Sequence, residues 1–319
     1  MSAHTAGKMT SRRGSPRVGL IVFLCLAAVL LGFLIYALIS LGWNDSIVTA
    51  YYETRCEGIE KGFRIVLISD LHRKKFDETN QTLVDLAASR EPDIICVDGD
   101  MLEKDHTAGE DEQFRYLLER LNAIAPVYFS AGNHDYTAYC VCAEKTESEY
   151  AGMRGRSDTL DLLESTGAVF LESAYADVEI NGERVRIGGF YPFAFRSAYD
   201  TDETWEKRRA FLEDYCDTDR FKLMLSHRPD TFIYEDAGSA WEIDLVLSGH
   251  THNGVVALPF GLGALWTSEG LFPEHDRGEF DLGSMRMIIT SGFAGNRGIP
   301  RVFNPPEIAV IDVLPSSGG

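Results

Sequence analysis

The sequence predicts an α/β fold, an α+β sandwich of two mixed β-sheets flanked by helices, preceded by one transmembrane helix. Three observations lead to this prediction. A run of 26 residues without charge, 18–43, precedes the rest of the chain. Short apolar segments that end in polar clusters then alternate with segments of helical spacing. In the second half of the chain, apolar segments follow one another with few helical segments between them.

The charge is divided unevenly along the 319 residues. The whole chain has 30 Lys+Arg and 49 Asp+Glu, a net charge of -19. The first 43 residues contain four basic side chains and no acid, so the remainder is even more acidic. An acidic body lacks the Lys and Arg that replace phosphate counterions, so we expect no nucleic-acid partner. Hydrophobic content of 45% excludes disorder over most of the chain.

The uncharged run 18–43 predicts a membrane anchor. As a helix it spans about 39 Å, more than the roughly 30 Å hydrocarbon core. The basic residues lie before it and Asp45 follows it, so the positive-inside rule puts residues 1–17 in the cytoplasm and the body outside. A cleaved signal peptide is the alternative, although its apolar core is usually 7–15 residues and no clear A-x-A site precedes Asp45. We therefore expect a single-pass cell-membrane protein.

The first half of the body alternates strands and helices. Residues 44–62 are expected to form a tether, 63–314 a folded domain and 315–319 a loose tail. Apolar runs predict strands at 63–69, 94–97 and 127–131. Helical spacing predicts helices over 80–89 and 110–124. This order is typical of a parallel sheet whose site lies at the carboxyl ends of its strands.

The second half of the body is richer in strands. Asn181-Gly182 is a favoured hairpin turn between two short apolar runs. The predicted strands are 178–180, 185–187, 221–226, 245–248, 255–258, 285–290 and 308–313. Their number predicts a second sheet packed on the first.

Five polar clusters follow predicted strands. They are Asp70-Leu71-His72, Gly99-Asp100, Gly132-Asn133-His134-Asp135, Ser226-His227 and Gly249-His250-Thr251-His252. Each cluster alone is weak evidence for a functional site, because a lone histidine or a turn after a strand is common in proteins. Together they supply carboxylates, an amide and imidazoles in the number and type suited to two divalent ions. They contain no thiolate, which disfavours a zinc finger or an iron–sulfur site.

The ordered set D-x-H, G-D, G-N-H-D, S-H and G-H-x-H resembles the calcineurin-like metallophosphoesterases. The resemblance spans residues 63–313. The anchor and the C-terminal stretch GIPRVFNPPEIAVIDV are similar to the membrane-associated or exported bacterial branch, the YkuE-like or YaeI-like proteins. The resemblance implies the two-sheet architecture of that family and two divalent metal ions, with manganese, zinc and iron all possible identities.

The resemblance also implies ligand roles. One metal ion would be held by Asp70, His72 and His252, the other by Asn133, His227 and His250. Asp100 would bridge both ions, since a carboxylate has lone pairs for two. Two ions lower the pKa of a bridging water, and the resulting hydroxide attacks phosphorus.

His134 would not bind metal and would donate a proton to the leaving alkoxide. Relatives have an Asp three residues after the bridging Asp that orients this histidine, and here the position is Glu103. Asp135 is expected to be structural.

Departures from the family pattern concern the substrate. After His72 the chain has Arg73-Lys74-Lys75, which would meet a phosphate or form a solvated loop. The family's G-H-T-H-G-G-Q here has Asn253 and Val255 in place of Gly and Gln. Asn253 tolerates the backbone shape and joins the candidate substrate contacts. The polar insert 136–156 could be a lid or a surface excursion.

These patterns predict a membrane-anchored metal-dependent phosphoesterase that hydrolyses phosphate esters, in particular phosphodiesters of phospholipid or cell-wall type. A phosphomonoesterase with the same metal site is the alternative. A metal-binding envelope receptor or scaffold without turnover is disfavoured, because every ligand position and His134 are filled. The sequence leaves the native metal and the oligomeric state open.

Overall fold

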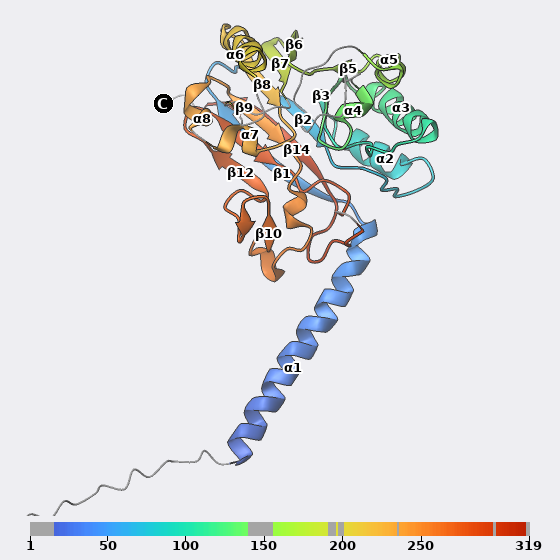
Figure 1. The fold of residues 1–319 in the computed structure, drawn as a ribbon, viewed down its shortest axis with the longest axis vertical. Helices are drawn as coiled ribbons and strands as arrows, with labels where there is room; N and C mark the ends of the chain where they lie inside the picture. Colours follow the sequence, from blue (N-terminus) through green and yellow to red (C-terminus); the bar gives the residue numbers. More distant parts are fainter. Residues whose placement is uncertain are drawn as a thin grey trace, which may run out of the picture.

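A computed structural model describes residues 16–139, 156–190, 196, 201–234, 236–295 and 298–316. The described part has two six-stranded sheets packed face to face, with helices on both outer faces (Figure 1). The mixed α/β two-sheet fold predicted from the sequence is therefore confirmed. One long apolar helix, α1 (Pro16–Leu41), extends away from this domain.

The first sheet has the strand order β1-β14-β2-β3-β4-β5. These strands are β1 (Val48–Cys56), β14 (Glu307–Pro315), β2 (Phe63–Ile68), β3 (Ile94–Asp98), β4 (Val127–Ser130) and β5 (Val169–Phe170). β2, β3, β4 and β5 run parallel, and β14 is antiparallel to β2. The predicted strands at 63–69, 94–97, 127–131 and 308–313 are confirmed.

The second sheet has the order β12-β13-β9-β8-β7-β6. Its strands are β6 (Ala174–Ile180), β7 (Glu183–Gly189), β8 (Phe221–Leu225), β9 (Leu245–Ser248), β12 (Gly278–Asp281) and β13 (Arg286–Ile289). Asn181 and Gly182 both have positive φ and turn β6 into β7, as predicted. A short hairpin of β10 (Trp266–Thr267) and β11 (Gly270–Leu271) lies apart from both sheets.

Three hydrophobic clusters hold the layers together. The central cluster joins the inner faces of the two sheets, for example Leu67 with Leu223 and Leu247. A second cluster packs the first sheet against α2 (Gln81–Ala88), α3 (Ala108–Asn122), α4 (Tyr136–Tyr139) and α5 (Asp158–Glu164). A third packs the second sheet against α6 (Asp202–Cys216), α7 (Asp230–Ile233) and α8 (Ala237–Ala240). The result is a helix–sheet–sheet–helix sandwich.

Two predicted segments differ from the structure. Residues 48–56, placed in a tether by the sequence prediction, form β1, which pairs in parallel with β14 along its whole length. Residues 255–258 form no strand and make only isolated bridges at Val256 and Ala257. Val255 has a φ of 61°, which interrupts extended backbone there. Of the insert 136–156, residues 140–155 lie outside the described residues.

The helix predicted at 110–124 begins two residues earlier. Thr107 caps it by accepting a hydrogen bond from the Glu110 amide, and the Glu110 side chain bonds back to the Thr107 amide. This reciprocal pair satisfies two backbone donors that the first helical turn leaves free. The helix thereby starts close to Glu103, the residue expected to orient His134.

Candidate metal centre

The predicted ligands come together because they follow the carboxyl ends of neighbouring parallel strands. Asp70 follows β2, Asp100 follows β3 and Asn133 follows β4 in the first sheet. His227 follows β8 and His250 follows β9 in the second sheet. Parallel strands end at the same edge of a sheet, so the facing edges of the two sheets form one site.

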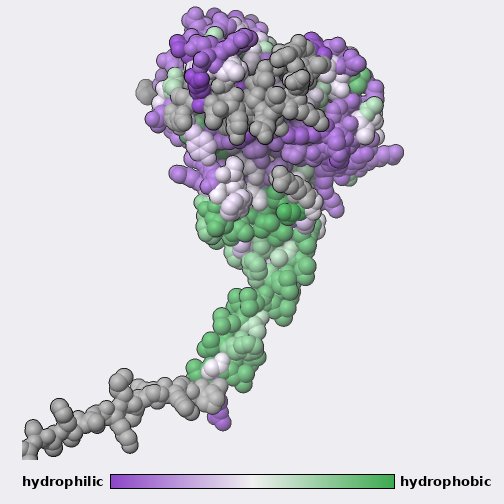
Figure 2. Space-filling view, in the orientation of Figure 1, coloured by the Kyte–Doolittle hydropathy of each residue, from purple (hydrophilic) through white to green (hydrophobic). Residues whose placement is uncertain are grey.

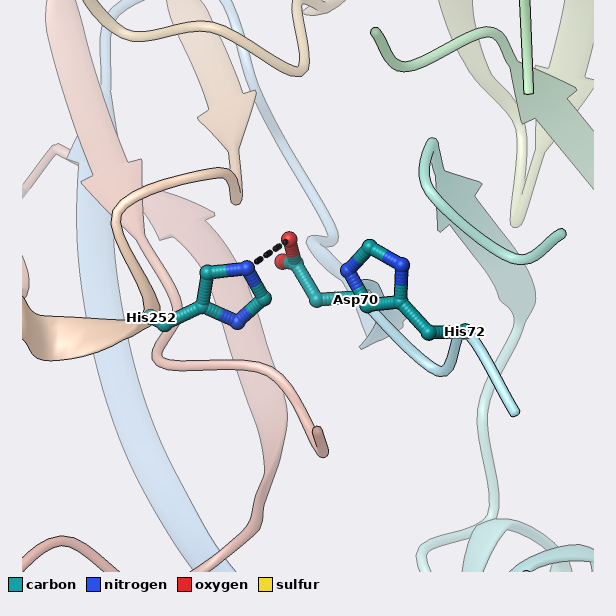
Figure 3. A group of neighbouring side chains, drawn as sticks. All are labelled: Asp70, His72 and His252. Carbon is teal, nitrogen blue, oxygen red and sulfur yellow. Dashed lines mark ion pairs between the residues drawn. The ribbon is translucent and has the colours of Figure 1, made fainter. Parts of the chain in front are cut away.

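The first group of side chains is Asp70, His72 and His252. Their candidate ligand atoms lie within 4.8 Å of one another. The Asp70 Oδ1 atom is 3.5 Å from His252 Nε2, and Figure 3 shows the Asp70 carboxylate between the two imidazole rings. This spacing suits a cation placed between a carboxylate and two imidazoles.

The second group is Asp100, His227 and His250, whose candidate ligand atoms also lie within 4.8 Å of one another. Asp100 Oδ2 is 3.1 Å from His227 Nε2 and 3.9 Å from His72 Nε2 of the first group. The Asp100 carboxylate therefore lies between the two groups, as a bridging ligand requires.

Buried polar atoms in this site lack partners. His72 Nε2 and Asn133 Oδ1 are buried and have no hydrogen-bond partner within the described part of the chain. Leaving such an atom unpaired costs about 1–3 kcal/mol. Each has a lone pair available for a divalent cation, so the donor set fits the metals that the resemblance implies.

Backbone carbonyls fix the orientation of two imidazoles. His227 Nδ1 lies 2.8 Å from the carbonyl oxygen of Asp98, and His252 Nδ1 lies 3.2 Å from that of Ala294. With the proton on Nδ1, each ring donates to its carbonyl and keeps a lone pair on Nε2 for a metal. The protein thus selects the tautomer needed for binding.

Burial and charge act differently on the four histidines. Burial lowers the pKa of His250 to about 3 and that of His252 to about 4, which keeps both neutral. Burial also acts to lower the pKa of His227 and His72, but neighbouring carboxylates outweigh it and raise both. The centre therefore attracts positive charge, which divalent cations can supply in place of protons.

Glu103 contacts two histidines with one carboxylate. Its Oε2 is 2.7 Å from His134 Nδ1, and its Oε1 is 3.0 Å from His72 Nδ1. The contacts with His72 and His134 lower the Glu103 pKa to about 2 despite burial. The His134 side chain is 30% exposed, so its ring is open to a substrate while Glu103 holds its inner nitrogen.

Main-chain amides hold both aspartates. The His134 amide donates to Asp100 Oδ1 at 2.7 Å, and the His250 amide donates to the Asp70 carboxylate at 3.1 Å. Asp135 is buried and accepts hydrogen bonds from the amides of Met101 and Gly132. Asp135 therefore ties two strand-end loops together, which matches the structural role expected for it.

Strained backbone accompanies the ligands. Asp70, His72, Asp100, His250 and His252 all have φ between 49° and 68°, a left-handed conformation that is uncommon for residues other than glycine. Such strain costs of order 1–3 kcal/mol per residue and persists where surrounding structure holds it. Its concentration here marks the strand-end loops as the specialised part of the molecule.

Glycines that contact the aspartates form part of the site, and the sequence prediction gave them no individual role. A Cβ at Gly249 would collide with Ser69 Oγ and Asp70 Oδ2. Gly292 packs against the Asp70 side chain, and its φ of 60° favours glycine. Gly249 belongs to a predicted cluster, but nothing in the sequence around Gly249 or Gly292 indicates these contacts with Asp70.

Replacing Gly132 by alanine is expected to displace the Asp100 carboxylate. A Cβ at Gly132 would collide with Asp100 Oδ1 and the Asp100 amide, although its φ is not left-handed. We expect metal affinity to fall about 10- to 100-fold, the range for a disturbed ligand environment. Calorimetric Mn²⁺ titration measures this. Gly109→Ala is the control because a Cβ there meets only Thr107 Oγ1 at 3.8 Å; equal affinities in both variants would contradict the expectation.

Arg301 and Asn304 support the histidine loop and were missed by the sequence analysis. The buried Arg301 guanidinium donates to the carbonyls of Ser291, Ala294 and Asn304. Asn304 Nδ2 donates to the His252 carbonyl at 2.7 Å. Both residues lie in the C-terminal stretch that resembles the membrane-associated branch. The sequence of this stretch does not predict their hydrogen bonds.

The candidate substrate residues have protein partners. Arg73 pairs with Asp105 and Glu110, and Lys74 pairs with Asp45 at 2.9 Å. Asn253 is buried, and its side-chain Nδ2 donates to Asn304 Oδ1 at 3.1 Å. Lys75 lines a cavity of about 190 Å³ together with His72 and Glu103. Of the three basic candidates, Lys75 alone forms no ion pair with another residue in the described part of the chain.

The model of the family described as calcineurin-like phosphoesterase matches residues 63–254. An uncharacterised metallophosphoesterase of Aquifex aeolicus is 29% identical over 82% of this chain and 90% of its own length. The uncharacterised metallophosphoesterase YkuE of Bacillus subtilis is 24% identical over 78% of each chain. A zebrafish transmembrane protein with a metallophosphoesterase domain is 27% identical over 60% of this chain and 41% of its own. The crystal structure of TT1561 of Thermus thermophilus has a TM-score of 0.46 at 12% identity, covering 73% of this chain and 91% of its own.

Proposed function

This chain belongs to the calcineurin-like phosphoesterases and is a metal-dependent phosphoesterase, and from that premise we propose a membrane-anchored enzyme with two metal ions that hydrolyses phosphodiesters of lipid or cell-envelope type. The observation that carries the proposal is the position of Asp100 between two groups of ligands. One carboxylate shared by two ligand sets is the arrangement that a pair of cations needs.

The proposed ligands divide between two sites. Asp70, His72 and His252 would hold one ion, and Asn133, His227 and His250 would hold the other, with Asp100 available to both. The spacing within each described group and the unpaired Asn133 oxygen support this division. When bound, the ions supply an acidified water and neutralise charge on the phosphate. A neutral amide in the set keeps the site electrophilic.

His134 is the proposed proton donor to the leaving oxygen. Glu103 contacts Nδ1, which leaves Nε2 of the partly exposed ring to face a substrate. In this position the ring can transfer a proton to the leaving oxygen. Glu103 acts through His134 and is a positioning residue.

The proposed arrangement in the cell follows from α1. This helix and its flanks, Arg17–Asp45, are long and apolar enough to cross a membrane. We place residues 1–17 in the cytoplasm and 18–43 in the membrane. The catalytic domain, which comprises the predicted range 63–314 together with β1, lies outside. The basic residues just before the helix support this orientation.

A hydrolysis assay tests the proposal. The full chain in detergent micelles, loaded with Mn²⁺, is expected to hydrolyse bis-p-nitrophenyl phosphate faster than p-nitrophenyl phosphate. Zn²⁺ and Fe²⁺ loading compares the three candidate metals. Preference for the monoester would favour the phosphomonoesterase. Absence of turnover with each metal, in protein shown by metal analysis to hold no ion, would exclude the two-metal enzyme.

A further inference from the structure

An apolar surface lies on the loops beside the metal centre. Its members are each more than half exposed, from 54% to 84%, and are Phe260, Leu262, Trp266, Leu271, Phe272 and Ile299. We call them the loop surface. Trp266 and Leu271 are paired across the β10–β11 hairpin, which places their side chains on one face of it. Figure 2 shows hydrophobic residues continuing from the base of the domain onto α1.

Contacts with α1 fix the position of this surface. The Tyr36 ring stacks on Phe260 with 5.8 Å between centroids and lies 4.7 Å from the ring of Phe303. The Ser40 hydroxyl accepts a hydrogen bond from the Phe303 amide. Asn44 donates to the Arg301 carbonyl at 2.9 Å and accepts from its amide at 3.1 Å. The end of the helix is therefore docked on the loops.

The length of α1 places the loop surface at the membrane boundary. Tyr36 lies 18 residues after Val18, the first residue of the uncharged run, which is about 27 Å along a helix. The hydrocarbon core is about 30 Å thick. If the core begins at Val18, Tyr36 and the Phe260 ring stacked on it lie near its outer edge. Aromatic side chains are favoured at this depth.

A cavity connects the loop surface with the metal centre. It has a volume of about 390 Å³, and its lining includes His250 and Thr251 of the metal-centre loop together with Trp266 and Ile299 of the loop surface. A ligand in it would meet a metal-ligating histidine and the exposed apolar side chains together. This combination suits an amphiphile with a polar phosphate and a long apolar chain.

We propose that the loop surface enters the interfacial layer of the bilayer that α1 crosses, and that the cavity receives the phosphate headgroup of a lipid from that bilayer. The proposal rests on the proposed function for its reaction and for its anchor. Continuity with α1 is the reason for choosing a bilayer as the occupant. If a partner protein covered this surface instead, the Phe260 ring beside Tyr36 would contact protein and not lipid.

Fluorescence tests the membrane contact without turnover. The full chain is placed in nanodiscs of phosphatidylcholine with brominated acyl chains or with ordinary ones. The signal of Trp266 is the difference between wild type and Trp266→Phe, which removes the contribution of the other tryptophans. We expect bromination to lower this difference at least twofold. An unchanged difference would overturn the proposal, and a partner protein would then be the better explanation of the surface.

Matched substrates test lipid entry. Ethyl p-nitrophenyl phosphate and hexadecyl p-nitrophenyl phosphate share a reacting group and differ in the chain. Phe260→Asn/Phe272→Asn removes two rings at positions of positive φ that Asn tolerates. We expect the hexadecyl-to-ethyl rate ratio in nanodiscs to fall at least tenfold in this variant. Tyr116→Ser/Val169→Ser removes two exposed apolar side chains on α3 and β5, far from α1 (Figure 1), and should keep the wild-type ratio.

The outcomes separate the two proposals. Equal ratios in wild type and the Phe260/Phe272 variant would overturn lipid entry while leaving the phosphoesterase intact. No hydrolysis of either ester by the metal-loaded wild type would overturn the proposed function and lipid entry with it. The bromine experiment would then still decide whether the loop surface contacts the bilayer.

Discussion

Asp100→Asn is expected to lower kcat/KM for bis-p-nitrophenyl phosphate by roughly a thousandfold or more, which corresponds to about 4 kcal/mol. Asp100 lies within reach of both ligand groups, with Oδ2 3.1 Å from His227 Nε2 and 3.9 Å from His72 Nε2. Asparagine keeps the shape but offers one neutral oxygen, which cannot balance two cations. Turnover and metal content are measured on the same preparation.

The control for this variant is Asp111→Asn. Asp111 is also a buried carboxylate with a histidine partner, since its Oδ1 lies 2.6 Å from His106 Nδ1, but it belongs to α3. Asp111→Asn should keep both metals and most of the turnover. If Asp100→Asn retained more than a tenth of wild-type activity with two ions bound, the shared-ligand arrangement would be wrong.

His134→Gln is expected to lower turnover about 10²- to 10⁴-fold on a substrate with an alkyl leaving group, the usual range for loss of a general acid. The loss should be much smaller when p-nitrophenolate leaves, because that group departs without a proton. Metal content should stay at the wild-type value. The His134 ring lies close to His72 and Glu103, but it belongs neither to the Asp70 group nor to the Asp100 group of ligands. Single-turnover rates on the two substrates provide the measurement.

Glu103→Gln distinguishes positioning from general damage. Glu103 contacts His134 and His72, so its loss should affect the alkyl ester more than the nitrophenyl ester. In a double variant with His134→Gln the two effects should not add, because both act on one proton transfer. Fully additive losses, equal on both esters, would contradict a role of Glu103 through His134. Glu103→Asp provides the conservative comparison.

The sequence was most informative where one segment carries its own signal. Apolar runs closed by Asp70 and Asp100 predicted both a strand and the polar cluster after it. It was least informative about β1, at a sheet edge, where exposed side chains are interspersed with partly or fully buried ones. Such a strand has no apolar run to distinguish it from a tether. Its partner β14 lies about 260 residues away.

Contacts between distant segments explain the remaining gaps. The Arg301 guanidinium donates to the carbonyl of Ala294, seven residues away, and this carbonyl also contacts His252 Nδ1 from 42 residues earlier in the chain. Gly292 likewise acquires its importance from Asp70, far away in the chain. Candidate ligands were predictable because their chemistry is local, whereas the residues that hold them depend on the completed fold.

The position of β14 sets the order in which the chain can fold. This last strand lies between β1 and β2, the first two strands of the body. During synthesis, β1 emerges early and has no neighbour in its sheet until residues 307–315 arrive. Loop closure over such a distance is slow and comes late. Helix α1 is therefore complete while the domain beside it still lacks β14, and β1 stays without its sheet neighbour until residues 307–315 have been made.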